Sequence, residues 1–196
     1  MTLSPSSRRQ VIAAAGGAAL AAVAALALAD GTAQPDRVLA SAVLGAAMAA
    51  IALEDSLRLR VPDPWVYGAL VTGIVWSAAV RLRSGDGLVA AGGGVLIAVA
   101  VCGGAFLAVR ETFYRLRGFD GLGFGDVKLA AAGGAWLGWE GFAFAVLVAA
   151  AGALAFVATR VARGRGWNAD QRLAFGAFLA PAVWATWLVL QGAGEG

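Results

Sequence analysis

The stretch LVAAGGGVLIAVAVCGGAFLAV, residues 88–109, carries no charged side chain. A helix needs about 20 apolar residues to cross the hydrocarbon core of a bilayer. A spanning backbone must also satisfy its own hydrogen bonds, and this stretch shows no strand-like alternation of apolar and polar residues. Residues 88–109 therefore predict a transmembrane α-helix.

Apolar segments of the same kind occur on both sides of this stretch. We predict six long spans and one short helix, about seven hydrophobic segments in all, and no strand. The long spans lie near residues 11–29, 38–54, 64–80, 88–109, 140–159 and 173–190, and the short helix, about 127–138, follows Asp126. The expected fold is an all-α, polytopic transmembrane bundle that forms a single domain, residues 1–196.

The composition supports a membrane protein. Hydrophobic residues make up 60% of the chain, against roughly 45–50% for a soluble domain. Charged residues account for only 14%, and the mean hydropathy is +0.77. The chain also holds 28 glycines, which suit close approach of helices in a bilayer. The lipid bilayer is thus an expected partner, and the net charge of +3 is not taken as a sign of nucleic-acid binding.

The distribution of arginine predicts the orientation. If the N-terminus is cytoplasmic and all seven segments cross, the loops on the cytoplasmic side hold eleven arginines and the loops on the other side hold three. Positively charged residues are enriched in cytoplasmic loops. We therefore expect the N-terminus inside and the C-terminus outside. The cytoplasmic arginines are Arg8, Arg9, Arg58, Arg60, Arg110, Arg115, Arg117, Arg160, Arg163, Arg165 and Arg172; the others are Arg37, Arg81 and Arg83.

The first predicted span, about 11–29, also has features of a targeting signal. Ser7-Arg8-Arg9 resembles the start of a twin-arginine signal, and Ala27-Leu28-Ala29 resembles a peptidase site. An ordinary first helix with positive flanking residues explains the same pattern. The first helix is thus either a regular span or a peripheral, signal-like segment.

The residue types restrict the chemistry. The chain has no histidine and one cysteine, Cys102. A catalytic histidine, a histidine metal site, an intrachain disulfide and a cysteine zinc site are all excluded. Acid–base chemistry must then come from carboxylates, lysine, tyrosine or water. No cofactor and no metal are expected.

Two aspartates are the candidate catalytic residues. Asp55 ends the second apolar segment, and Asp126 opens the short helix. The predicted topology places both on the cytoplasmic side, near the same depth. Ionisable residues at membrane depth are costly and are usually functional. Close carboxylates push their two pKa values apart and share a proton, so one can activate water while the other polarises a carbonyl group.

Structural roles for the same acids remain open at this point. Asp126 is also suited to cap the short helix, and Asp55 to pair with Arg58. Asp63 followed by Pro64 is typical of an N-cap with a first-turn proline. The glycines that precede Asp126 permit close backbone approach and so could pair with an extended substrate; they also fit a plain flexible loop.

The sequence GFGDVKLAAAGGAWLG, residues 123–138, resembles the signature of the type IV prepilin peptidases, which are bacterial membrane aspartic proteases of the Gly-x-Gly-Asp type. The aspartate of that motif falls on Asp126. The other catalytic aspartate of the family precedes an Ile/Val-Pro-Asp sequence, as Asp55 precedes residues 61–63. Residues 174–179, AFGAFL, are similar to the family's Pro-Phe-Gly-Pro-Phe-Leu but lack both prolines. The resemblance extends from about residue 40 to 190.

The resemblance implies a short-form leader peptidase in the bacterial cytoplasmic (inner) membrane. Asp55 and Asp126 would form the catalytic pair, with the motif residues Gly123, Gly125 and Lys128 in support. The substrates would be type IV prepilins or pseudopilins, cut at the cytoplasmic face. Their leaders are basic, so nearby acids could bind them, and the candidates are Glu54, Asp63 and Asp120.

Many members of the family also methylate the new N-terminus and carry a further cytoplasmic domain with paired Cys-x-x-Cys motifs. Only about eight residues separate the first two predicted spans here, and no such cysteines occur. We therefore do not expect methyltransferase activity. Three other functions also fit the acids: another Gly-x-Gly-Asp protease, such as a preflagellin or signal-peptide peptidase type; a proton- or cation-coupled transporter subunit; and a non-catalytic pilus assembly subunit.

Overall fold

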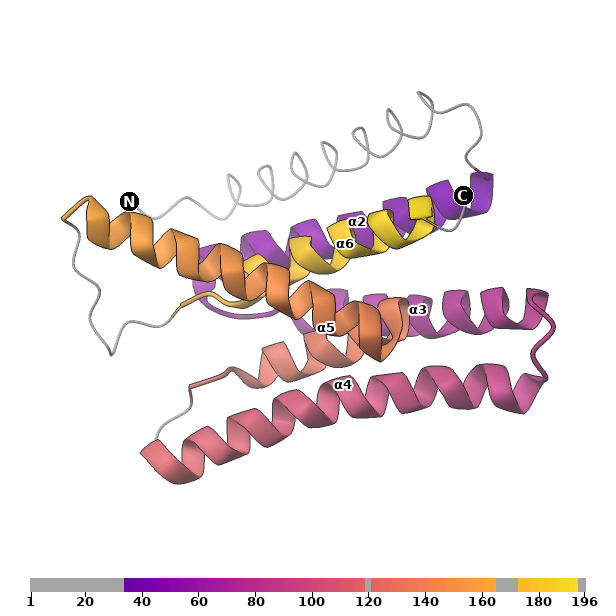
Figure 1. The fold of residues 1–196 in the computed structure, drawn as a ribbon, viewed down its shortest axis with the longest axis horizontal. Helices are drawn as coiled ribbons and strands as arrows, with labels where there is room; N and C mark the ends of the chain where they lie inside the picture. Colours follow the sequence, from indigo (N-terminus) through magenta and orange to yellow (C-terminus); the bar gives the residue numbers. More distant parts are fainter. Residues whose placement is uncertain (1–33, 119–120, 165–172, 194–196) are drawn as a thin grey trace.

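The computed structural model describes residues 34–118, 121–164 and 173–193, which form five helices without a strand (Figure 1). The helices are α2 (Pro35–Arg58), α3 (Asp63–Arg83), α4 (Leu88–Arg117), α5 (Phe124–Ala162) and α6 (Gly176–Ala193). The predicted all-α fold is confirmed for these residues. The first predicted span, 11–29, its signal-like flanks and Asp120 lie outside them.

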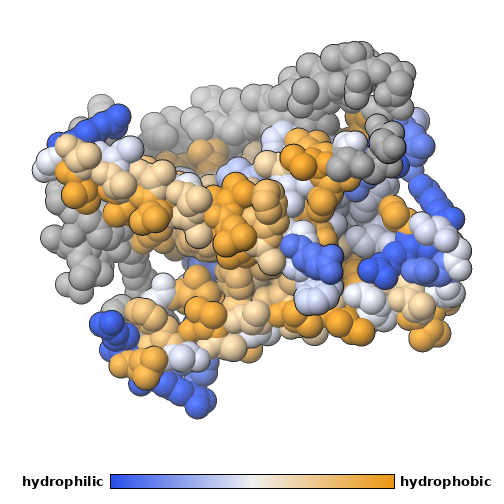
Figure 2. Space-filling model, in the orientation of Figure 1, coloured by the Kyte–Doolittle hydropathy of each residue, from blue (hydrophilic) through white to orange (hydrophobic). Residues whose placement is uncertain are grey.

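Four of these helices, α2 to α5, are long and apolar enough to cross a membrane, and α6 is a shorter apolar helix. Large side chains such as Val89, Leu147 and Leu154 are more than two-thirds exposed. Hydrophobic surface covers much of the visible face of the bundle (Figure 2). A soluble monomer rarely exposes so much apolar surface, so the chain is a multi-pass membrane protein. The expected number of seven segments stays a prediction.

Helix α5 consists of two parts that meet at Gly138. This residue has φ 68° and ψ 178°, which breaks the helix. Phe142 packs on Gly133, although residues nine positions apart lie about 13 Å from each other in a straight helix. Figure 1 accordingly shows the second part running back over the bundle from a sharp turn. The predicted short helix, about 127–138, and the following span, about 140–159, correspond to these two parts.

The core lies where α2, α5 and α6 meet, and small residues allow the helices to approach closely. The indole of Trp136 on α5 fills the space beside Gly73 on α3, where an added Cβ would come within 2.6 Å of the ring. The same indole donates a hydrogen bond to the Ala69 carbonyl oxygen at 2.7 Å. These contacts hold the first part of α5 against α3. The largest fully buried side chains are Trp187, Leu44, Met48, Ile51, Leu129, Leu179, Val66 and Val183.

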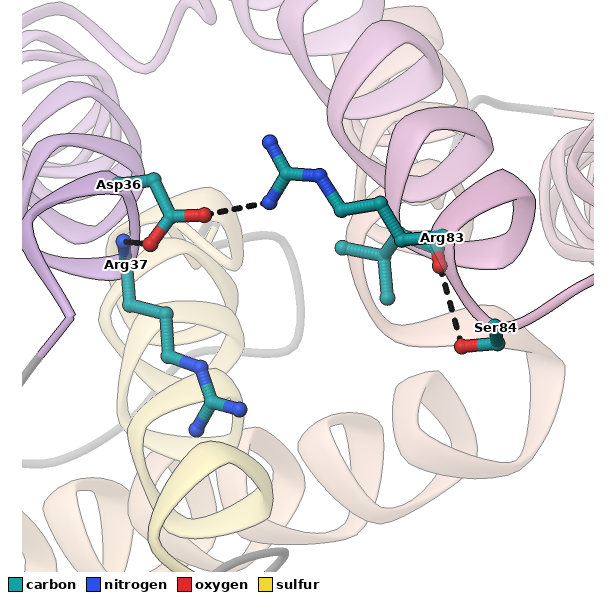
Figure 3. Close-up of polar contacts among 5 residues, drawn as sticks. Asp36, Arg37, Arg83 and Ser84 are labelled. Atoms are coloured by element: carbon teal, nitrogen blue, oxygen red, sulfur yellow. Dashed lines mark hydrogen bonds and ion pairs between the residues drawn. The ribbon is translucent and has the colours of Figure 1, made fainter.

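An ion pair joins α2 and α3 at one end of the bundle. Arg83, in the last turn of α3, donates to Asp36, in the first turn of α2, at 2.5 Å (Figure 3). A negative residue in a first turn and a positive residue in a last turn also complement the two helix dipoles. This end holds the start of α2 and the end of α3, so it lies opposite Asp55 and Asp126.

Gly138→Ala is expected to destabilise the protein. Open space surrounds the position where an added Cβ would lie, so the cost comes from the backbone alone. The φ and ψ of Gly138 belong to a region that is essentially restricted to glycine, and a side chain there costs about 1–3 kcal/mol. The melting temperature in detergent should fall.

Gly92→Ala is the matched control for this substitution. An added Cβ at Gly92 also meets open space, but the residue lies in the regular helix α4. Alanine is favoured over glycine in a helix by about 1 kcal/mol, so this variant should melt at the same or a higher temperature. Equal melting temperatures for the two variants would contradict the assignment of strain to the turn.

Candidate active site

Asp55 is buried at the C-terminal end of α2, with 5% of its surface exposed. Its Oδ2 accepts a hydrogen bond from the backbone N–H of Ala177, at the start of α6, at 3.0 Å. An added Cβ at Gly176 would lie 2.9 Å from the same oxygen. Glycine at position 176 therefore lets the α6 backbone approach the carboxylate. Arg58 pairs with Glu54 at 2.7 Å and not with Asp55, so the expected alternative of an Asp55–Arg58 pair is wrong.

Asp126 is buried in the first turn of α5, with 8% of its surface exposed. Its Oδ2 accepts a hydrogen bond from the Gly123 backbone N–H at 3.2 Å. Gly123 is the N-cap of α5, so Asp126 closes the first turn from the third helical position. It thus has the structural role that the sequence left open, but this role uses only one oxygen. The other, Oδ1, is buried and has no hydrogen-bond partner among the residues that the structure describes.

Both aspartates line one cavity of about 160 Å³. They come from different helices and are about 70 positions apart in the chain. Two carboxylates at the wall of one cavity, one of them with an unpaired oxygen, can hold a water molecule between them. The remaining wall comes from Leu59 at the end of α2, from the glycine-rich segment and from two residues that precede α6. The full lining is Asp55, Leu59, Gly121, Leu122, Gly123, Asp126, Leu173 and Phe175.

The linker between α2 and α3 connects the two carboxylates through packing. It leaves α2 at Leu59, which has a left-handed backbone with φ 53°. Val61 is then buried between α5 and α6. An added Cβ at Gly125 would come within 2.6 Å of Val61, and one at Gly176 within 3.2 Å. Gly125 of the motif therefore leaves the space that lets the linker lie beside Asp126.

Lys128 and Asp63 join the N-terminal ends of α5 and α3. Lys128 Nζ donates to Asp63 Oδ1 at 2.7 Å. The ammonium group also lies 5.2 Å from the ring centre of Tyr67 and 5.3 Å from that of Phe124, within the range of cation–π attraction. The expected N-cap role of Asp63 is wrong, because the N-cap of α3 is Pro62 and no side chain caps the helix. The α3 carboxylate reaches across to α5 instead.

The structure describes two of the three candidate leader-binding acids, and both are in ion pairs. Glu54 pairs with Arg58 and Asp63 with Lys128. Asp120 lies outside the described residues. In the part of the chain that the structure describes, no three His, Cys, Asp or Glu side chains gather into a group that could hold a metal ion.

The contribution of residues 175–177 was not predicted from the residues themselves. The AFGAFL segment entered only through its resemblance to a family motif, with no role assigned. In the structure, Phe175 lines the cavity, Gly176 makes room and Ala177 donates to Asp55. The sequence signal that could have identified this segment is a glycine that follows an aromatic residue at the start of an apolar helix.

Comparison with known proteins identifies the relatives of this chain. A model of the type IV leader peptidase family matches residues 42–158. A prepilin leader peptidase/N-methyltransferase of Burkholderia pseudomallei is 35% identical over 152 residues, which cover 76% of this chain and 45% of the relative. Proteins with the same name from Aeromonas hydrophila (29% identical; 74% of this chain, 48% of the relative) and Pectobacterium carotovorum subsp. carotovorum (35%; 64% and 42%) are also similar.

The chain spans less than half the length of these curated relatives. No solved structure matches it significantly. The matched residues 42–158 include both aspartates, the linker between α2 and α3, and the glycine-rich motif. With this match over more than half of its length, the chain belongs to the type IV leader peptidase family.

Proposed function

We propose that this chain is an aspartic endopeptidase that removes the basic leader of type IV prepilins or pseudopilins at the cytoplasmic membrane face. The observation that carries the proposal is the position of Asp55 and Asp126, which come from distant helices, are both buried and line one cavity. Membership of the leader peptidase family supports the choice of substrate. The arginine distribution supports the cytoplasmic location.

The mechanism uses a water molecule held between the two carboxylates. One ionised carboxylate takes a proton from the water, which attacks the scissile carbonyl carbon. The other carboxylate, protonated, donates a hydrogen bond to the carbonyl oxygen as negative charge develops there. Two buried carboxylates at one cavity favour a shared proton over two full charges. Oδ1 of Asp126, which accepts no hydrogen bond from the described residues, is the atom best placed to contact the water.

The substrate must be extended for a peptide bond to reach the carboxylates. Residues 121–123 form an irregular segment along one wall of the cavity, and an extended chain can pair with such a backbone. The apolar stem of the substrate would then dock among the helices from the lipid. Glu54, Asp63 and Asp120 would attract the basic leader through their negative charge; the ion pairs of Glu54 and Asp63 are partly exposed, and such pairs contribute up to about 1 kcal/mol.

The proposal covers the peptidase activity alone. The names of the relatives include both leader peptidase and N-methyltransferase. The short connection between the first two predicted spans gives no place for the cytoplasmic domain that the resemblance associates with methyl transfer. We therefore propose cleavage without N-methylation.

Asp55→Asn and Asp126→Asn should each abolish cleavage of a co-expressed prepilin. Each change keeps the size of the side chain but removes a group that exchanges a proton in the reaction. The loss of one general acid or base lowers kcat by about 10²–10⁴-fold. An immunoblot that separates the precursor from the mature pilin measures the effect.

Glu111→Gln is the matched control for these variants. Glu111 is an acid toward the same end of the bundle, but it is exposed and pairs with Arg115 on the surface of α4. This variant should cleave at the wild-type rate. If either aspartate variant processed the prepilin as fast as Glu111→Gln does, the two-aspartate mechanism would be wrong.

Lys128→Met and Asp63→Asn should each lower kcat several-fold, because the pair fixes the start of α5, and with it Asp126, against α3. A partly exposed ion pair contributes up to about 1 kcal/mol, which corresponds to roughly a fivefold rate effect. The double variant should be no slower than the slower single variant, because each single substitution already removes the whole Lys128–Asp63 ion pair. Additive losses in this double-mutant cycle would show that the two residues act separately.

Glu54→Gln should raise KM for a prepilin with a basic leader and leave kcat nearly unchanged. A charge at the rim of a site acts mainly on association with a charged partner. The rise should shrink when the leader's basic residues are replaced by glutamine, and also at high salt, which screens such charges. A KM increase that is the same for the basic and the neutral leader would exclude Glu54 from leader recognition.

A further inference from the structure

A second cavity, of about 210 Å³, lies between α3, α4, α5 and α6. It surrounds the turn at Gly138, which is separated from Asp126 by the length of the short helix, about 18 Å. The other lining residues come from the last turns of α3 and α6 and from the first turns of α4. This cavity therefore lies toward the end of the bundle opposite the catalytic pair and is not part of that site.

One wall of this cavity carries a positive charge. Arg81 of α3 lines it, and its guanidinium lies on Gly94 of α4, where an added Cβ would come within 2.8 Å of Nη1. This nitrogen forms an ion pair with the Asp86 carboxylate at 3.8 Å, a distance longer than a hydrogen bond. About half of the Arg81 side chain is exposed. The guanidinium is thus held at the cavity with hydrogen-bonding capacity to spare.

The opposite wall carries partial negative charge. Residues 134–138 line the cavity, and they include the C-terminal end of the short helix. The last carbonyl groups of a helix lack partners within it and carry the negative end of its dipole. Ser77 donates to the Ala135 carbonyl at 2.6 Å. The side chain of Gln191 adds an amide at the same cavity.

The depth of this cavity makes such a lining unusual. With its start at the cytoplasmic face, as proposed above, the short helix, residues 124–137, extends about 21 Å and ends before the far side of a hydrocarbon core about 30 Å thick. Backbone groups that end inside the bilayer need polar partners. Behind the wall, Trp187 packs against Trp76 and Trp136, and its buried N–H has no acceptor among the described residues.

We propose that this cavity binds the headgroup of a phospholipid that carries both a phosphodiester and a primary ammonium group, as in phosphatidylethanolamine. The phosphodiester accepts hydrogen bonds from the Arg81 guanidinium, which recognises phosphate geometry well. The ammonium group donates to the carbonyl end of the short helix and to the Gln191 side chain. A quaternary ammonium group has no N–H to donate, so phosphatidylcholine fits less well. The bound lipid would stabilise the turn at Gly138.

Purified full-length protein in detergent provides the test. Phosphatidylethanolamine, phosphatidylglycerol and phosphatidylcholine with identical acyl chains are added separately, and lipid binding is measured by native mass spectrometry together with the melting temperature. Phosphatidylethanolamine should bind most tightly and raise the melting temperature most. Soluble glycerophosphoethanolamine should compete only weakly, because it lacks the acyl chains that hold a lipid beside the bundle. Full competition by the soluble headgroup would overturn a lipid as the ligand.

Arg81→Gln should weaken phosphatidylethanolamine binding at least tenfold. Arg83→Gln is the control, since this neighbouring arginine is paired with Asp36 and does not line the cavity; it should bind the lipid as wild type does. Gly94→Val keeps the Arg81 charge but displaces the guanidinium, and it should also weaken binding, whereas Gly92→Val should not. Equal binding by wild type and Arg81→Gln, or equal binding of phosphatidylcholine and phosphatidylethanolamine, would overturn the proposal. None of these measurements depends on peptidase activity.

Discussion

The burial of two carboxylates inside a membrane bundle is the constraint on which the rest of the site depends. A buried charge is costly unless hydrogen bonds compensate it. Asp55 receives the Ala177 N–H at 3.0 Å and Asp126 receives the Gly123 N–H at 3.2 Å. Each carboxylate is therefore held by a backbone donor at or beside the start of a helix, where unpaired N–H groups are available. One oxygen of Asp126, Oδ1, has no hydrogen-bond partner among the described residues, and the structural roles leave this oxygen unexplained.

The glycines of the motif follow from the same constraint. A backbone N–H reaches a buried carboxylate only if no side chain blocks the approach. Gly176 has no side chain, so the backbone at the start of α6 can approach Asp55. Gly125 has a related function, because it admits Val61 of the linker beside the start of α5. The ion pair of Lys128 and Asp63 connects the start of α5 to the start of α3, directly after the linker, from outside the cavity. Packing and charge thus act jointly to bring the end of α2 and the start of α5 to one wall.

The turn at Gly138 has consequences at the other end of the bundle. Because α5 turns at Gly138, its second part can return over the bundle and contact α6, as Phe156 does with Phe178. The turn also leaves a helix end inside the bundle, and the cavity with Arg81 lies at that end. The candidate active site and the second cavity therefore lie at the two ends of one short helix.

The sequence by itself determined the class of protein, the approximate positions of the helices and the choice of two aspartates as candidate catalytic residues. These depend on local properties, namely apolar length, the absence of histidine and the short-range motifs around Asp55 and Asp126. Only the tertiary structure decided which groups meet across the chain. It decided that the Ala177 N–H donates to Asp55 and that Asp63 contacts Lys128 instead of capping α3. It also decided which residues surround the cavity at Gly138. Each of these arrangements brings together residues that are far apart in the sequence or lie on either side of a turn. Apolar periodicity in a membrane protein does not predict such contacts, because lipid-facing and protein-facing surfaces are similarly apolar and the pairing of helices depends on shape and hydrogen bonds.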